Sequence, residues 1–321
     1  YELHTLKDSE TIARLATGIK RFTLPDEHNF VKIFYQLADS KGGYASNGLD
    51  MLASIYQNRR QYPKAAEILR RAIKEHGNNG RQQQLDQIVK NWGRFEPTMQ
   101  LPAGKGATVE YRFRNGDKVS FTAHEIKVKD LLDDVKKYLR ANNKNLDWNK
   151  LDIQNLGHRL VHQNEAKYIG AKVAGWDLDL KPKPEHNDRR VTVATPLQKA
   201  GAYLLKAVMK DGNTTQIILW LDDTAIVKKP LDGGQYYYVA DAVTGEPLAK
   251  TNLEFFGYRQ RQIGNTNNFT TDIKNFSEFT DADGQVIKLG NNNDEVNQFQ
   301  WLITATKDGR YAYLGFTGIW Y

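Results

Sequence analysis

Between Asn29 and about Asn91, apolar residues recur three and four positions apart, and the only proline in this stretch is Pro63. Such spacing with few helix breakers is typical of amphipathic helices. The first part of the chain is therefore predicted to be helical.

One part of this helical stretch has the spacing of a tetratricopeptide unit, whose repeat is about 34 residues. Small Ala53, Ala65 and Ala72 would let two antiparallel helices approach closely. Gly77 is expected to end the second helix. A lone repeat cannot bury its own hydrophobic face, so flanking apolar residues are expected to cover it. The residues at repeat spacing are Leu49, Leu52, Ala53, Tyr56, Tyr62, Ala65, Leu69 and Ala72, and the expected covers are Phe30, Val31, Phe34, Tyr35 and Leu37 before them and Leu85, Ile88, Val89 and Trp92 after them.

The pattern changes after Gly93, where prolines and glycines interrupt the helical spacing. Residues 107–126 alternate between apolar and polar, which predicts a hairpin turning at Asn115-Gly116-Asp117. A helical insertion is expected next, because Leu131, Leu132, Val135 and Leu139 fall on one helical face. Further strands are predicted at 176–180, 190–195, 201–209 and 215–221, with Asp211-Gly212 turning the last two into a hairpin.

The remainder of the chain is again rich in strands separated by glycine and asparagine turns, a pattern typical of a β-sandwich. Two Asn-rich segments, 264–271 and 291–297, are expected to be surface loops. The chain stops on the apolar Gly318-Ile319-Trp320-Tyr321, and we expect the natural protein to continue. The predicted strands are 236–241, 251–256, 276–280, 286–289, 300–307 and 310–316.

Together these patterns predict a multidomain α + β chain with three parts. Residues 1–93 form an α-helical domain of tetratricopeptide-like hairpins. Residues 94–221 form an antiparallel β-sandwich with a helical insertion at about 128–169. Residues 222–321 form a second antiparallel sandwich that continues into further domains. A length of 321 residues agrees with three domains of about 100 residues each.

Composition excludes several kinds of chemistry. The chain has no cysteine, so disulfides, thiolate metal sites, cysteine nucleophiles and a thioester are absent from it. No apolar run approaches the roughly 20 residues that a membrane span needs. The net charge is +7, but lysines and arginines are interleaved with acidic residues, as in Lys127-Val128-Lys129-Asp130. This mixing indicates solvated faces and no nucleic-acid partner. No leader sequence is visible, so any signal peptide is expected to have been removed.

Three motifs lie in the second half of the chain: Gly201-Ala202-Tyr203-Leu204-Leu205-Lys206-Ala207 with 217–221 and 225–229, then 238–249 around Thr244-Gly245-Glu246-Pro247, and Thr280-Asp281-Ala282-Asp283-Gly284. They resemble motifs of bacterial alpha-2-macroglobulin-like proteins, and the first resembles the junction between two macroglobulin domains of that family. Gly245 can adopt a positive φ, and Pro247 fixes its own φ at a position that needs no hydrogen-bond donor, so the Thr-Gly-x-Pro turn suits a sandwich edge.

The resemblance implies macroglobulin (MG2-type) domains in the frame of a protease trap, in which a bait segment is cut and a thioester elsewhere captures the protease. It implies endopeptidase inhibition by the whole molecule, proteases as its partners, and a periplasmic, cell-surface or secreted location. No thioester sequence lies in this chain, so only a scaffold role is implied for these residues.

A few side chains suggest chemistry, but simpler explanations compete. His158, His162 and Glu165 could place metal ligands on one helical face, although a solvated or capping role is favoured because no distant third ligand can be named. Asp281 and Asp283 resemble the start of a calcium loop that lacks its terminal glutamate, so a β-turn is favoured. The pairs Asp222-Asp223 and Asp232-Gly233 are expected in turns, their side chains satisfying nearby backbone donors.

No nucleophile elbow, phosphate-binding loop or dinucleotide fingerprint is present, so no catalytic, cofactor-binding or metal-binding residue is predicted, and the chain is not expected to be an enzyme. Trp148, Trp220, Trp301 and Trp320 are expected in core or interdomain packing. The leading hypothesis is a scaffold and interaction segment of an alpha-2-macroglobulin-like protein, with the helical domain docking a peptide or protein. Alternatives are an adhesion or glycan-binding protein with an exposed aromatic row around Tyr237, and an accessory fragment of an enzyme.

Overall fold

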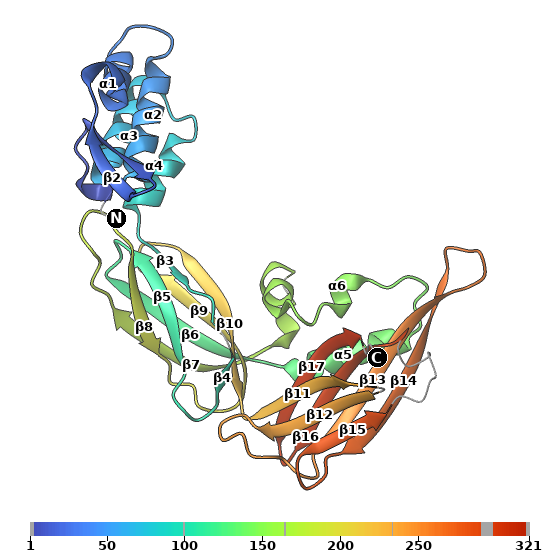
Figure 1. Ribbon diagram of the computed structural model, residues 1–321. Helices are drawn as coiled ribbons and strands as arrows, with labels where there is room; N and C mark the ends of the chain where they lie inside the picture. Colours follow the sequence, from blue (N-terminus) through green and yellow to red (C-terminus); the bar gives the residue numbers. More distant parts are fainter. Residues whose placement is uncertain (1–2, 99, 164, 233, 290–297, 319–321) are drawn as a thin grey trace.

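The computed structural model describes residues 3–98, 100–163, 165–232, 234–289 and 298–318. Most of its elements are strands, with helices at the N-terminal end and between two strands of the middle part. Figure 1 shows three bodies in a row. We call them the helical unit, the middle sandwich and the third sandwich.

The helical unit is formed by four helices whose apolar faces share one core. Asn29 caps the first helix by accepting a hydrogen bond from Lys32 N at 3.1 Å. Gly48 lets two helices touch, because a Cβ there would lie 2.8 Å from Ala38 N. The predicted helix end at Gly77 is confirmed. The helices are α1 (Phe30–Ala38), α2 (Ala45–Asn58), α3 (Tyr62–His76) and α4 (Arg81–Val89).

The core of this unit contains all eight residues at repeat spacing, seven of them buried and Tyr62 partly so. Trp92 was predicted to lie on the last helix, and that prediction is wrong. The α4 helix ends at Val89 because Lys90 turns to an extended conformation, and Trp92 begins a strand.

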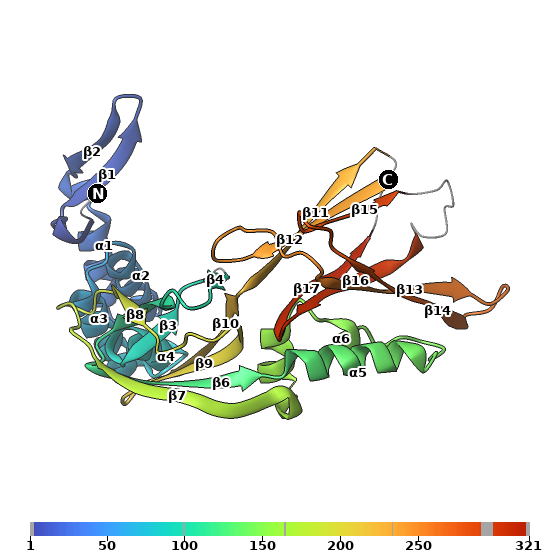
Figure 2. The ribbon, with the colours of Figure 1, turned by 90° about the horizontal axis from the view of Figure 1, so that it is seen from below.

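A β-hairpin precedes the helices and was not predicted. Strand β1 (Glu10–Leu15) pairs with β2 (Gly18–Thr23), and short 3₁₀ turns η1 (Leu3–Thr5) and η2 (Asp26–His28) flank them. Figure 2 shows this hairpin projecting away from the helices.

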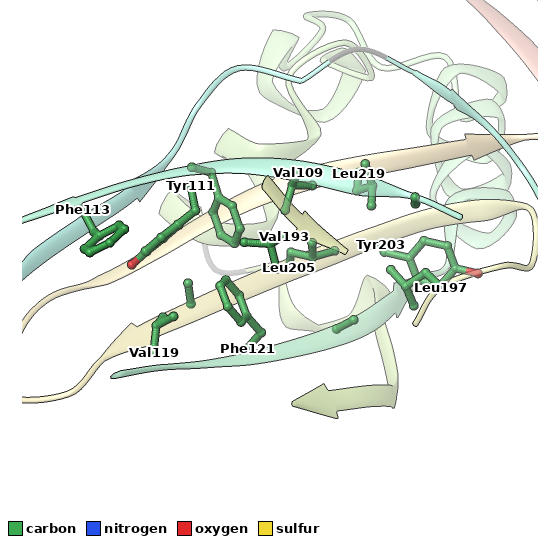
Figure 3. Packing of buried hydrophobic residues seen from close by; sticks show 14 of the residues in the cluster. Val109, Tyr111, Phe113, Val119, Phe121, Val193, Leu197, Tyr203, Leu205 and Leu219 are labelled. Atoms are coloured by element: carbon green, nitrogen blue, oxygen red, sulfur yellow. The ribbon is translucent and has the colours of Figure 1, made fainter. Parts of the chain in front are cut away.

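The middle sandwich packs a five-stranded sheet, in the order β4-β10-β9-β6-β7, against a three-stranded sheet, in the order β3-β5-β8. Figure 3 shows its core, where Tyr111 and Phe113 of one sheet meet Phe121, Leu205 and Leu219 of the other. The strands are β3 (Trp92–Phe95), β4 (Leu101–Pro102), β5 (Thr108–Arg114), β6 (Lys118–Ile126), β7 (Ile169–Asp179), β8 (Arg189–Ala194), β9 (Gly201–Met209) and β10 (Thr214–Asp222).

The hairpin predicted for residues 107–126 is wrong. Strand β5 pairs with β3 and β8, whereas β6 pairs with β7 and β9, so Asn115-Gly116-Asp117 forms a corner between two sheets. Both strands alternate toward the same core, and this alternation fits a corner as well as a hairpin. The hairpin predicted at Asp211-Gly212 is confirmed, because β9 and β10 pair antiparallel on either side of it.

Between β6 and β7 the chain forms a set of short helical elements led by one longer helix. These are α5 (Val128–Arg140), α6 (Trp148–Leu151), a π-helical turn η3 (His158–His162) and a 3₁₀ turn η4 (Ala166–Tyr168). Figure 2 shows α5 beneath the third sandwich, beyond the end of the sheet from which it emerges.

The third sandwich packs a three-stranded sheet, β11-β12-β15, against a four-stranded sheet, β14-β13-β16-β17. Tyr237, Phe255 and Trp301 are buried between the sheets. The loop predicted at 264–271 is shorter than expected because β14 begins at Phe269, and the loop predicted at 291–297 lies outside the described residues. The strands are β11 (Thr224–Leu231), β12 (Gly234–Asp241), β13 (Asn252–Gln262), β14 (Phe269–Phe279), β15 (Gln285–Leu289), β16 (Gln300–Lys307) and β17 (Arg310–Gly318).

Across the described ranges, the helices are too short and too polar for any of them to cross a membrane.

Candidate functional site: the joint between the two sandwiches

A cleft of about 640 Å³ opens where the middle sandwich meets the third sandwich. Its walls come from the end of β10, the start of α5 and strand β17, which lie far apart in the sequence. Aromatic, acidic and basic side chains share it. Among them are Lys129, Trp220, Asp222, Tyr311 and Tyr313.

The covalent link between the sandwiches forms the floor of this cleft. Strand β10 ends at Asp222 and β11 begins at Thr224, so Asp223 alone separates them. Short strand β4 pairs with this end of β10, and Ala103 N donates to Asp222 O at 2.9 Å. A link of one residue between two hydrogen-bonded strands leaves little freedom for the two bodies to rotate.

The side chain of Asp222 is half-buried in the cleft. Within the described part of the chain, no side chain or backbone N–H donates a hydrogen bond to its carboxylate. Burial, followed by the negative charge of Asp223, raises the pKa of Asp222 to about 6. Burial, followed by the charge of Asp222, raises the pKa of Tyr313 to about 12. The cleft therefore holds a carboxyl group that titrates near neutral pH.

Asp222 was predicted to be a turn residue that satisfies nearby backbone donors, and that prediction is wrong. Its backbone completes β10, and its side chain faces the cleft. Asp223 lies in the bend, where its Oδ1 accepts a hydrogen bond from the Thr224 hydroxyl at 2.8 Å.

Beside the cleft, helix α5 is buried against the outer face of the third sandwich. The apolar stripe predicted on this helix is buried, with Leu131 and Leu139 fully enclosed. Its partners are Phe256, Tyr258 and Leu302, which face away from the third sandwich's own core. In sequence, α5 lies between two strands of the middle sandwich, but it packs against residues of both sandwiches.

A buried ion pair crosses this seam. Lys136 Nζ lies 2.6 Å from Glu254 Oε2, and the Thr304 hydroxyl donates to the same oxygen at 3.3 Å. Burial alone would raise the pKa of Glu254, but the hydrogen bond and charge of Lys136 outweigh burial and lower it. Asn142 adds a contact by accepting a hydrogen bond from Thr271 N at 2.7 Å. Lys136 and Asn142 are thus each paired with a residue of the third sandwich across the seam.

The Thr-Gly-x-Pro turn also contributes to the joint. Asp241, at the end of β12, accepts hydrogen bonds from the backbone N–H groups of Val243 and Thr244 and from Arg310 Nη1 at 2.6 Å. The hydrogen bond from Arg310, then those from the backbone, lower the pKa of Asp241 to about 2. Arg310 Nη1 also donates to Asp223 O at 2.9 Å, so this turn holds the interdomain link.

The other residues considered from sequence lie apart from this joint. His158 and His162 stack with ring centroids 5.3 Å apart, whereas Glu165 forms an ion pair with Arg159 at 2.8 Å. The three side chains therefore do not converge on one point. In the described ranges no group of three or more histidine or acidic side chains could hold a metal ion.

The turn predicted at Asp281 is confirmed. Its Oδ1 accepts hydrogen bonds from Asp283 N and Gln285 N, and Gly284 has φ +71°. The turn predicted at Asp232 is also present, whereas Gly233 lies outside the described residues.

Tyr237 is fully buried, so the exposed aromatic row expected by the adhesion hypothesis is not centred on it. Trp301 is in the core and Trp220 packs at the joint as predicted. The prediction that Trp148 packs in a core or between domains is wrong, because this side chain is 61% exposed. Trp320 lies outside the described residues.

The sequence resemblance identified residues 201–229 as similar to a junction between two domains, but the packing of α5 on the third sandwich was not predicted. One signal was available: Phe255 and Phe256 are adjacent aromatics in a strand, where alternation would leave one of them exposed. A strand with apolar residues on both faces needs a second partner, and α5 is that partner.

No protein-family model matches the sequence, and no curated protein matches it. Among solved structures, the chain is similar to a fragment of native alpha-2-macroglobulin from Escherichia coli spanning domains MG0-NIE-MG1, with 15% identity and a TM-score of 0.43 over 71% of this chain and 65% of that one. A fragment of the same protein spanning NIE-MG1 has 17% identity and a TM-score of 0.42, over 71% of this chain and 97% of that one. A cryo-EM reconstruction of the native protein has 15% identity and a TM-score of 0.39, over 71% of this chain and only 13% of that one. The chain is thus similar to macroglobulin-domain fragments of a bacterial alpha-2-macroglobulin, and it spans a small part of the whole molecule.

Proposed function

We propose that this chain is a scaffold segment of a bacterial alpha-2-macroglobulin-like protein, and that the whole molecule inhibits endopeptidases by trapping them. In this proposal the chain performs no catalysis of its own and acts outside the cytoplasm. Residues 94–221 and 222–321 are two macroglobulin-like domains.

One observation carries the proposal: parts of the first two motifs on which the sequence resemblance rests lie together at a single joint. Ala202 and Leu204 of the first motif lie in the core that α5 shares with the third sandwich. Residues 225 and 226 line the cleft, and Asp241 of the second motif binds Arg310, which donates to Asp223 O in the link. The motifs behind the resemblance therefore include residues at the joint between two domains. A scaffold needs such joints to hold its domains in a fixed arrangement.

The buried seam supports a structural role. Apolar burial contributes roughly 25 cal/mol per Å², and the fully enclosed residues of α5 and β13 belong to one continuous core. Two sandwiches joined by such a core and by a one-residue link form a stiff pair. A protein that encloses another protein needs stiff segments between the parts that move.

We further propose that the helical unit is a tetratricopeptide-like docking or spacer module, bounded near the predicted residue 93. Ala53, Ala65 and Ala72 are each no more than 1% exposed, which supports the close approach of α2 and α3. A single repeat offers only a small groove, so weak peptide binding is expected.

The proposal is tested by incubating the full-length protein with trypsin and comparing two substrates. Trapping predicts that cleavage of a large protein substrate falls, while cleavage of a small chromogenic peptide continues, because a trapped protease keeps its active site but is closed to large molecules. The matched control is the 321-residue segment alone, which should protect neither substrate. Full cleavage of the large substrate in the presence of the full-length protein would refute the inhibitor function.

A further inference from the structure

The hairpin β1–β2 is an isolated two-stranded ribbon with exposed apolar side chains. Every residue of β2 is exposed, and Leu15, Ile19 and Phe22 are 43%, 43% and 40% exposed. Isolated two-stranded hairpins are marginally stable in water. Within the described ranges, β1 and β2 pair only with each other, so each keeps an outer edge of unpaired backbone groups.

The base of the ribbon is fixed to the helical unit. The buried guanidinium of Arg59 donates to Lys7 O at 3.1 Å and to Glu10 O at 2.8 Å. Gln61 Nε2 donates to Leu6 O at 2.6 Å, and Lys64 pairs with Asp8 at 2.9 Å. Because the ribbon is held only at its base, the rest of it projects from the helical unit, as Figure 2 shows.

The two faces of the ribbon are alike. Pairing places Ile12 opposite Arg21 and Arg14 opposite Ile19 on one face, and Ala13 opposite Lys20 on the other. Each face therefore mixes apolar and basic side chains. A flat surface could cover only one of these faces, whereas a strand added along an edge would extend both and satisfy the unpaired backbone groups.

The charge of the ribbon favours an acidic strand at its edge. Arg14, Lys20 and Arg21 are basic, and the single acid, Glu10, already accepts from Lys7 N and lies 3.5 Å from Arg21. In the described part of the chain no ion pair involves Arg14 or Lys20. Two copies of this ribbon would repel each other, because like charges opposite one another destabilise strand pairs.

We propose that the β1–β2 ribbon binds an extended acidic segment of a partner protein by adding it as a third strand to the exposed β2 edge. The backbone of β2 supplies the hydrogen bonds, and Arg14 and Lys20 attract the acidic side chains. This interaction is separate from protease trapping and from the joint between the sandwiches.

The test titrates the 321-residue protein with a short peptide of Val-Val-Glu-Glu repeats, which places glutamates on both faces of an added strand. Binding is measured by calorimetry, and hydrogen exchange is followed at residues 18–23. Binding is expected, with slowed exchange in β2. The double substitution Arg14→Glu and Lys20→Glu should weaken it by about 10-fold or more, since two favourable pairs become unfavourable. The matched control Lys41→Glu and Lys105→Glu makes the same charge change at exposed sites off the ribbon and should leave affinity within about 2-fold.

Three results would overturn the proposal. The first is equal binding by a peptide with N-methylated backbone amides, which would show that charge alone suffices. The second is binding without slower exchange in residues 18–23. The third is failure of the acidic peptide to bind while phosphatidylglycerol vesicles bind and lose affinity in the ribbon variant, which would assign the ribbon to a lipid surface.

Discussion

The joint between the helical unit and the middle sandwich is made by polar contacts, whereas the joint between the two sandwiches is made by a shared apolar core. At the first, Asn115 Nδ2 donates to Ile88 O at 2.8 Å and Lys90 O at 3.0 Å, and Arg114 Nη1 donates to Gln87 O at 2.7 Å. At the second, the stripe of α5 packs on Phe256 and Leu302, both fully buried.

The contrast has a consequence for motion. An intramolecular hydrogen bond contributes about 1 kcal/mol net, while burying a large apolar side chain contributes about 1.5–3 kcal/mol. The sandwiches should therefore move as one body, and the helical unit should loosen first. Hydrogen bonds are directional, so the polar joint defines the orientation of the helical unit. It contributes little free energy to holding the unit in that orientation.

The largest expected effect comes from removing the centre of the apolar joint. Phe256 of β13 is fully buried against α5, with the guanidinium of Arg140 5.1 Å from its ring centroid. Phe256→Ala should cost about 3–5 kcal/mol because it leaves a cavity. Calorimetry should then show that a single unfolding transition of the two sandwiches splits into two.

The neighbouring Phe255 provides the matched control. It points into the core of the third sandwich rather than into the joint. Phe255→Ala should lower the transition of the third sandwich without making the link at residues 222–224 sensitive to proteases. If Phe256→Ala left a single transition and a protected link, the two sandwiches would not depend on this seam.

At the apolar joint, the helix could be predicted from the sequence, but its packing partner could not. The stripe of Leu131, Leu132, Val135 and Leu139 was enough to predict α5 and its buried face, because helical spacing is local. It could not show that the face packs on Phe256, which lies more than a hundred residues later. Partners at such distances are set by topology, which local patterns do not encode.

Errors arose where one local pattern fits two arrangements. Alternation on either side of Asn115-Gly116-Asp117 fits a hairpin and a corner equally. Asp222 looks like a turn residue because Asp223 follows it, whereas in the fold its burial at the joint, followed by the charge of Asp223, raises its pKa. The missed hairpin at β1–β2 carries so little apolar alternation that its strands resemble loop sequence.

A smaller effect is expected from the carboxyl in the cleft, and it depends on pH. The pKa of Asp222 is raised from 3.8 to about 6, so its contribution to stability is complete below pH 3.8 and is lost as the pH rises through 6. A shift of this size is at most about 3 kcal/mol, and partial solvent access reduces it to about 1 kcal/mol. Asp222→Asn should therefore raise the melting temperature at pH 7.5 but not at pH 4.

Asp211→Asn makes the same charge change in the exposed turn of the β9–β10 hairpin. It should leave the melting temperature unchanged at both pH values. An equal gain in both variants would attribute the effect to net charge rather than to the cleft.

The smallest expected effect on the two sandwiches comes from a change at the polar joint. Asn115 has φ +61°, a conformation that glycine also adopts easily, so Asn115→Gly removes the side-chain hydrogen bonds without straining the backbone. The loss should be about 2–3 kcal/mol, because the variant loses two bonds to backbone oxygens of the helical unit and one with His186 Nδ1. The sandwiches should keep their transition, while hydrogen exchange at the end of α4 and around Asn91 should become faster.

Asn142 also has a positive φ, of +51°, and bridges the other joint through Thr271. Asn142→Gly is thus the matched change at the apolar joint, and there the buried seam should hold exchange nearly constant. Faster exchange of the same size at both joints would mean that hydrogen bonds, rather than the apolar core, limit motion at each.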